Sequence, residues 1–230
     1  MKDVISIDFI KTPTADIKNL AELKRYWAKI KNLLVQREQH FDNVWKNSNE
    51  KQIFAELAFC LFTPQSKAVS CWAVVLELAR QKMLFSSSAE TISATIKNVR
   101  FHRNKAAYLI KARELFSDSG KIKIKSRLSA FSDIYELRAW LIKNVKGIGY
   151  KEAGHFLRNI GLGKDLAILD RHILKNLVFF GAIDQIPKNL SPKEYEKIEK
   201  KMLGFAAAAK IPMSHMDMIL WCKESGGIFK

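Results

Sequence analysis

A lysine and an aspartate nineteen residues apart are the side chains best suited to covalent chemistry in this chain. Lys151 lies in the first turn of a predicted helix, where a cation opposes the positive end of the helix dipole. Asp170 opens another predicted helix, where backbone N–H groups would hold its carboxylate rigidly. A neutral amine can attack an electrophilic carbon, and a fixed anion stabilises a nearby cation. The pair therefore suits a reaction through a cationic sugar, and the alternatives are a surface lysine in an ion pair and an ordinary helix cap.

The segment 145–151 predicts a tight hairpin between two helices. Gly147 and Gly149 let the backbone turn sharply and approach a partner closely. The amides of such a turn, with the N-terminus of the next helix, can bind phosphate. Because Gly-x-Gly alone is weak evidence, an ordinary corner between helices is the alternative.

Asp217 and Trp221 lie four residues apart and therefore share one face of a predicted helix near the C-terminus. An indole offers a stacking surface to a nucleobase, and a carboxylate accepts hydrogen bonds from ring N–H groups. The pair could form a base pocket. The alternative is a core tryptophan beside a solvated charge.

Charge is the outstanding feature of the composition. The 230 residues include 39 Lys and Arg against 23 Asp and Glu, a formal net charge of +16. This excess predicts a polyanionic partner, either nucleic acid or an acidic membrane surface. Arg103, Arg171 and His172 are basic groups on both sides of the hairpin and fit contacts to phosphate.

Several classes are excluded by what the sequence lacks. Three widely spaced cysteines cannot build a disulfide framework or a four-cysteine iron–sulfur site. There is no Gly-rich nucleotide loop and no zinc spacing, so we expect no cofactor and no metal. No run of 18 apolar residues and no signal peptide is present. We expect a cytoplasmic, nucleoid-associated protein.

The apolar periodicity predicts an all-α protein with short connections. Residues 121–125 alternate like a strand without a partner and are interpreted as an extended basic linker. Expected helices cover about residues 17–34, 53–62, 64–83, 86–99, 104–116, 133–144, 150–160, 171–180, 192–209 and 212–223.

These motifs together resemble the helix–hairpin–helix DNA glycosylases, and most specifically type 2 8-oxoguanine DNA glycosylase/AP lyases. The resemblance rests on the hairpin sequence Gly-Ile-Gly-Tyr-Lys-Glu-Ala, then His-Phe-Leu-Arg-Asn, then Asp-Arg-His at 170–172, and the C-terminal stretch 221–230. Thr63-Pro64-Gln65-Ser66 resembles the Gln-x-Ser segment of that superfamily. One departure is Ala167-Ile168-Leu169, where the family has a Gly/Pro-rich loop. The likeness spans about residues 50–230, so we divide the chain into an N-terminal helical segment (1–45) and a glycosylase core (46–230).

The resemblance implies two helical subdomains with the active site in the cleft between them. It implies that Lys151 forms a Schiff base with the sugar and that Asp170 stabilises the cationic transition state. It further implies a base pocket and a DNA-binding surface. The implied pocket residues are Asp217, Trp221, Gln65 and Lys230, the last through its α-carboxylate at the end of a docked tail; the implied DNA contacts are Gly147, Gly149, Arg171, His172 and Arg103.

The partner implied by the resemblance is double-stranded DNA containing 8-oxoguanine, bound by a monomer with no membrane and no protein partner. Three alternatives stay open. The same fold could excise another damaged base, although relatives acting on oxidised pyrimidines or adenine mismatches often carry a four-cysteine cluster that this chain lacks. A non-catalytic helix–hairpin–helix module would need neither Lys151 nor Asp170. A membrane-surface protein would carry strongly two-faced helices, whereas apolar residues here are spread over many helices.

Overall fold

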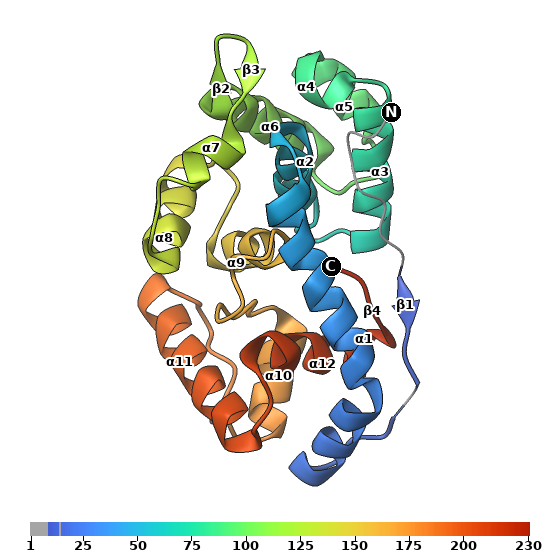
Figure 1. Ribbon diagram of the computed structural model, residues 1–230, viewed down its shortest axis with the longest axis vertical. Helices are drawn as coiled ribbons and strands as arrows, with labels where there is room; N and C mark the ends of the chain where they lie inside the picture. The colour runs from blue at the N-terminus through green and yellow to red at the C-terminus, as the bar shows by residue number, and fades with distance from the viewer. Residues whose placement is uncertain (1–8, 14) are drawn as a thin grey trace.

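The computed structural model describes residues 9–13 and 15–230 and is mainly helical (Figure 1). Its described part contains twelve α-helices and four two-residue strands, which confirms the predicted all-α class. In chain order the elements are β1 (Ile10–Lys11), α1 (Leu20–Asn47), α2 (Glu50–Phe62), α3 (Ala68–Arg80), α4 (Met83–Ser86), α5 (Ala89–Thr95), α6 (His102–Phe116), β2 (Ser117–Asp118), β3 (Lys121–Ile122), α7 (Ile124–Leu128), α8 (Ile134–Asn144), α9 (Tyr150–Asn159), α10 (Arg171–Phe179), α11 (Pro192–Ala209), α12 (Met213–Ser225) and β4 (Gly227–Ile228).

Two hydrophobic clusters divide the helices into two subdomains. The first cluster is built by α2 to α9, which fill the upper half of Figure 1 together with the β2–β3 hairpin. The second joins most of α1 to α10, α11 and α12 in the lower half. The buried side of α1 contributes Leu34 and Phe41 to the second cluster and Val44 to the first, so this helix passes from one subdomain to the other. The two-subdomain architecture predicted from the resemblance is confirmed.

The long helix α1 extends beyond the residues 17–34 expected from the sequence. It begins after Asn19, whose side chain accepts a hydrogen bond from Glu22 N at 3.0 Å. It continues to Asn47 because buried apolar residues recur at helical spacing as far as Val44. A single rigid helix therefore links the N-terminal part of the chain to both cores.

The helix expected from Pro64 is wrong, because a turn lies there and α3 begins at Ala68. Gln65 adopts a left-handed φ of 56°, which a helix cannot contain. The ammonium group of Lys105 donates to Phe62 O at 2.6 Å and to Pro64 O at 2.7 Å. A side chain some forty residues away thus shapes this turn.

The unpaired basic linker predicted over residues 121–125 is also wrong. Strand β3 pairs antiparallel with β2, directly ahead of it in the chain. The turn between them consists of Ser119 (φ 48°) and Gly120 (φ 74°), the positive angles of a tight hairpin. The partner strand has only two residues, too few to show alternation, and α7 starts immediately after the hairpin.

The two ends of the described chain lie side by side. Strand β1 pairs antiparallel with β4, and the last residues run on into the body of the protein (Figure 1). Ile228, Phe229 and Lys230 are all buried. The docked C-terminal tail expected from the sequence is therefore present.

Candidate active site

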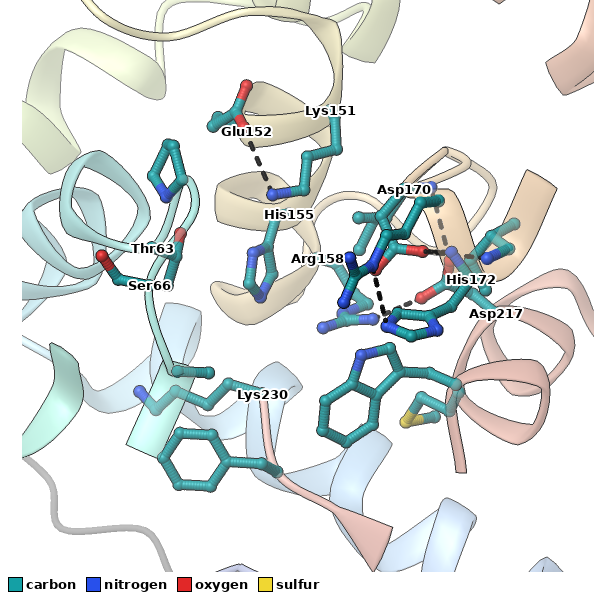
Figure 2. Close-up of a pocket in the computed structure, with 18 of the residues that line it drawn as sticks. Thr63, Ser66, Lys151, Glu152, His155, Arg158, Asp170, His172, Asp217 and Lys230 are labelled. Carbon is teal, nitrogen blue, oxygen red and sulfur yellow. Dashed lines mark hydrogen bonds and ion pairs between the residues drawn. The ribbon is translucent and has the colours of Figure 1, made fainter. Parts of the chain in front are cut away.

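A pocket of about 1000 Å³ lies between the two subdomains (Figure 2). The first subdomain contributes residues of α9 and of the turn ahead of α3. The second contributes residues of α10 and α12, and the C-terminal tail closes one side. The volume is at the upper end of the range for small-molecule sites, and a cleft between subdomains is a common place for one.

Lys151 reaches this pocket from the start of α9. Gly149 is the N-cap of the helix, and its backbone N–H donates a hydrogen bond to Glu152 Oε2 at 3.4 Å. The other oxygen of Glu152 lies 3.2 Å from Lys151 Nζ (Figure 2). The lysine side chain is 26% exposed, so the amine is largely removed from solvent but still open to the pocket. The ion pair anticipated as an alternative exists, and it holds the amine at the pocket wall.

Asp170 is the N-cap of α10. Its Oδ1 accepts hydrogen bonds from His172 N at 2.8 Å and from Ile173 N at 2.9 Å. These bonds fix the carboxylate, which also lines the pocket. The structural and the functional interpretation of Asp170 are thus compatible.

The apolar segment before Asp170 is held by side chains of α11 and α12. Glu199 accepts from Ala167 N at 2.8 Å, and Asp217 accepts from Ile168 N at 3.3 Å. The hydroxyl of Tyr195 donates to Ala167 O at 2.7 Å and accepts from Leu169 N at 3.1 Å. Side-chain partners therefore fix this backbone without the Gly/Pro-rich sequence of the family.

Asp217 lies on the wall of the pocket but is already engaged. It is 3% exposed, and it forms an ion pair with Arg158 in addition to its bond from Ile168 N. Burial raises the pKa of Asp217 to about 6, while the neighbouring Arg158 guanidinium works in the opposite direction. Trp221, one turn further along α12, also lines the pocket and is half-buried. The predicted pair therefore shares the cavity, with Asp217 orienting Arg158 there.

Lys230, the last residue, reaches the opposite wall (Figure 2). Its ammonium group lies 2.5 Å from Glu56 Oε1 and 3.2 Å from the centroid of the Trp72 ring. The ring of Phe229 packs edge-on against Phe59, with centroids 6.2 Å apart. These contacts fix the end of the chain beside the cavity.

His155 stands between Lys151 and Lys230 in the pocket wall (Figure 2). It is one turn after Lys151 on α9, and its ring packs edge-on against Phe59 at 5.5 Å. Burial, with the nearby Arg158 charge, holds the pKa of His155 well below its ordinary range. The wall therefore presents a neutral imidazole next to the amine.

The predicted site residues divide into two groups. Most of them line the pocket, whereas three lie away from it. Those in the pocket are Lys151, Asp170, Asp217, Trp221, Lys230, Gln65, Arg171 and His172; those away from it are Gly147, Gly149 and the exposed Arg103.

The hairpin glycine Gly147 has a structural requirement of its own. Its φ is 91°, and an added Cβ would lie 2.4 Å from Tyr108 Cδ2. The hairpin thus packs against α6 at a point where only glycine fits. Its predicted contact with phosphate stays a prediction.

Sequence reasoning missed four residues that shape the site, namely Glu56, Arg158, Glu152 and His155. Glu152 could have been found as the third residue after the cap Gly149, the position of a capping-box acid. The polar residue Glu56 within an apolar helix was a second signal, because a buried acid requires a partner. Arg158 and His155 belong to the motif His-Phe-Leu-Arg-Asn on which the resemblance rests, but nothing local indicated that these two side chains face the pocket.

Other features of the described residues bear on cofactors and membranes. Over residues 9–13 and 15–230, no group of three or more His, Cys, Asp or Glu residues is placed to hold a metal ion. Within the same part of the chain, no helix is both long and apolar enough to cross a membrane.

Comparison with known proteins shows that the chain is similar to members of one family. Residues 34–211 match the family model described as 8-oxoguanine DNA glycosylase. An 8-oxoguanine DNA glycosylase/AP lyase of Fusobacterium nucleatum is 43% identical over 209 residues, covering 91% of this chain and 96% of the relative. The corresponding protein of Methanocaldococcus jannaschii is 34% identical, with coverage of 93% and 99%.

Solved structures agree with the sequence relatives. The crystal structure of the M. jannaschii enzyme in complex with a 15mer DNA containing 8-oxoguanine superimposes with a TM-score of 0.83 at 32% identity, covering 92% of this chain and 99% of that one. The enzyme of Thermotoga maritima gives a TM-score of 0.82 at 31% identity, covering 92% and 98%. The fold, the cleft and the similarity over nearly the whole chain lead to one assignment: this chain belongs to the 8-oxoguanine DNA glycosylase family.

Proposed function

We propose that this protein is a bifunctional repair enzyme that excises 8-oxoguanine from duplex DNA and then cleaves the strand at the resulting abasic site. The observation that carries the proposal is that Lys151 and Asp170 line the same pocket of about 1000 Å³. A largely buried amine and a fixed carboxylate facing one cavity are the two groups that the reaction requires. The names of the relatives and the net charge of +16 support the same substrate.

The duplex would bind across the mouth of the pocket. Arg171 is exposed there, and Arg100 lines the pocket beside the turn that carries Gln65. Phe101, next to Arg100, is 52% exposed at a left-handed φ of 59°. An exposed ring at the rim suits insertion into the stack that opens when a base is extruded. Extrusion itself costs a few kcal/mol, which binding to the phosphates offsets.

Excision begins when the Lys151 ammonium group gives up a proton, for which Glu152 Oε1, 3.2 Å from Nζ, is an available acceptor. The Lys151 nitrogen bonds to C1′ of the damaged nucleotide while the N-glycosidic bond breaks, and the departing base takes the bond's electron pair together with the proton that the attacking nitrogen loses. Positive charge develops on the sugar during this step. The carboxylate of Asp170, held by its two backbone hydrogen bonds, stabilises that charge.

Strand cleavage proceeds from the covalent intermediate. The sugar ring opens as O4′ takes a proton, which gives a Schiff base between Lys151 and C1′. Loss of a proton from C2′ then expels the 3′ phosphate by β-elimination. Hydrolysis of the imine frees the amine for another cycle.

Recognition of the base would use the C-terminal side of the pocket. The ring of Trp221 offers a stacking surface to the extruded base. 8-Oxoguanine differs from guanine in having an N7–H donor, so an acceptor in the pocket separates the two. The α-carboxylate of Lys230 and the carboxylate of Asp217 are the candidate acceptors, of which only the α-carboxylate is not already in an ion pair with Arg158.

We further propose that the enzyme works as a monomer on nucleoid DNA. All the residues assigned to the reaction come from a single chain, and damaged duplex DNA is found at the nucleoid.

Borohydride trapping tests the mechanism directly. Wild-type protein incubated with an 8-oxoguanine duplex and borohydride should yield a covalent protein–DNA adduct. Lys151→Gln should abolish the adduct, base excision and strand cleavage while duplex binding is retained. Lys193→Gln is the matched control, because this exposed lysine is also the second residue of a helix, α11, and lies outside both the pocket and the hairpin.

Two results would contradict the proposal. The wild-type protein could give no adduct with an 8-oxoguanine duplex but an adduct with another lesion in a panel. That result would retain the Schiff-base mechanism and assign a different substrate. Loss of binding in parallel with activity in Lys151→Gln would make Lys151 a phosphate contact in a DNA-binding module.

A further inference from the structure

We propose that the N-terminal strap, residues 9–12, is a positioning element for the lesion pocket, because it holds the C-terminal tail in place. The inference rests on the proposed function, and it assigns a role to a part of the chain that lies outside the matched family model of residues 34–211. The strap touches the tail, and the tail lines the pocket. The strap itself is not among the residues that line it.

The backbone contacts between strap and tail form a continuous antiparallel ladder. Ile10 pairs with Ile228 and Lys11 with Gly227. The N–H of Thr12 donates to Gly226 O at 3.0 Å, which extends the ladder by one residue. Among the described residues, β1 is the one strand that pairs with β4.

A side-chain hydrogen bond anchors the strap to the body of the protein. The hydroxyl of Tyr26, on α1, donates to Thr12 Oγ1 at 2.9 Å. Thr12 is 7% exposed and Tyr26 is 5% exposed, so the bond is shielded from water. Two-residue strands are weak by themselves, and this anchor gives the ladder a fixed base.

Gly227 shows how closely the strap is applied to the tail. An added Cβ would lie 2.3 Å from Phe9 Cζ and 2.5 Å from Ile10 O, and all three of its nearest atoms belong to the strap. On its other side, the carbonyl oxygen of Gly227 lies 3.1 Å from both Cys222 Sγ and Ser225 Oγ. The start of the tail is therefore clamped between the strap and the end of α12.

The clamp sets the position of the last three residues of the chain. Ile228, Phe229 and Lys230 come directly after Gly227, and all three line the pocket. Lys151 and Asp170 lie on α9 and at the start of α10, which the strap does not pair with. Loosening the strap should impair recognition of the base and spare the amine chemistry.

Two substitutions should each weaken the contact between the strap and the tail, one in the strap and one in the tail. Thr12→Pro removes the N–H that donates to Gly226 O, and Gly227→Ala forces a methyl group against the strap. Gly204→Ala is the matched control for the second, because a Cβ at Gly204 on α11 meets nothing within 4 Å. Thr12→Val removes only the hydroxyl and tests the anchor to Tyr26.

Three readouts are compared for each variant: single-turnover excision of 8-oxoguanine, cleavage of a pre-formed abasic site, and release of Lys230 by a carboxypeptidase specific for C-terminal lysine. We expect Thr12→Pro and Gly227→Ala to lower excision at least tenfold, to change abasic-site cleavage less than threefold, and to speed release of Lys230 at least tenfold. Thr12→Val should shift the first and third readouts in the same directions but by less. Gly204→Ala should change none of them.

The outcomes separate this inference from the proposed function. If Thr12→Pro and Gly227→Ala leave the release of Lys230 unchanged, the inference that the strap holds the tail in place is overturned. Faster release with unchanged excision, or equal loss of both DNA reactions, overturns its role in recognition. Wild-type protein that excises no 8-oxoguanine contradicts the proposed function, and the carboxypeptidase readout still decides whether the strap holds the tail.

Discussion

The ammonium group of Lys230 lies 2.5 Å from Glu56 Oε1, although the two residues are 174 positions apart in the chain. Both side chains are almost fully buried. Burial raises the pKa of Glu56 and lowers that of Lys230, and the ion pair opposes both shifts. Because Glu56 lies on α2, the pair ties the end of the chain to the opposite subdomain.

Removing the cation from this pair should destabilise the protein. Lys230→Met leaves the Glu56 carboxylate buried without its cation, and we expect the free energy of unfolding to fall by about 3–5 kcal/mol. Adding Glu56→Gln removes the orphaned charge and should restore most of the loss in urea titrations. A double variant no more stable than the single one would contradict this account.

Asp170→Asn should separate the helix-capping role of Asp170 from its proposed role in excision. The amide oxygen can still accept from His172 N and Ile173 N, so we expect unfolding free energy to fall by about 1 kcal/mol or less. Excision should fall about 100-fold or more in single-turnover assays, because the fixed charge facing the sugar is lost. Asp133→Asn, at the cap of α8, is the matched control. Near-normal turnover in Asp170→Asn would show that Asp170 only caps α10.

The turn that carries Gln65 should depend on Lys105. Its ammonium group donates to Phe62 O, Pro64 O and Ser66 Oγ at 2.6, 2.7 and 3.2 Å. Lys105→Met removes all three bonds and leaves Pro64 O without this donor, whereas Phe62 O keeps Cys71 Sγ and Ser66 Oγ keeps Arg100 N. The free energy of unfolding should fall by about 1–3 kcal/mol, and excision should fall with it.

The exposed Lys111, also on α6, provides the matched control for that change. Lys111→Met should leave both stability and excision close to the wild-type values. A turn that stays intact in Lys105→Met, seen as unchanged stability and excision, would show that other contacts fix it.

Stability should decrease in acid because of His40. Burial lowers the pKa of His40 to about 4, assisted by the charges of Lys230 and Arg37. The unfolded histidine titrates near 6.5, so the contribution of the neutral ring is present above that pH and is lost as the pH falls towards 4. The expected loss over this range is about 1–2 kcal/mol, below the full pKa difference because the ring is only half-buried and solvent screens it. Thermal unfolding at several pH values should show a shallower acid slope for His40→Asn, and an unchanged slope would contradict the assignment.

The sequence by itself determined the features that depend on neighbouring residues. Apolar spacing determined the all-α class, and three helices begin within a residue of where the sequence places them, namely α8, α10 and α11. Each is capped by a side chain directly ahead of it: Asp133, Asp170 and Ser191. The sequence also placed Lys151 and Asp170 each at the start of a helix, where the surroundings are set by the adjacent backbone. These features could be predicted because the interactions that define them are local.

The tertiary structure decided the features that depend on residues far apart in the chain. The turn after Phe62 is shaped by Lys105, and the Asp217 carboxylate is engaged by Arg158, which lies beside it. The same holds for the end of the chain: a tail of four residues has no structure of its own, and it gains one from Glu56 and from the pairing of β4 with β1. A buried charge or an unpaired strand edge requires a partner, but it does not specify where in the sequence that partner lies. Periodicity and spacing therefore cannot identify such contacts.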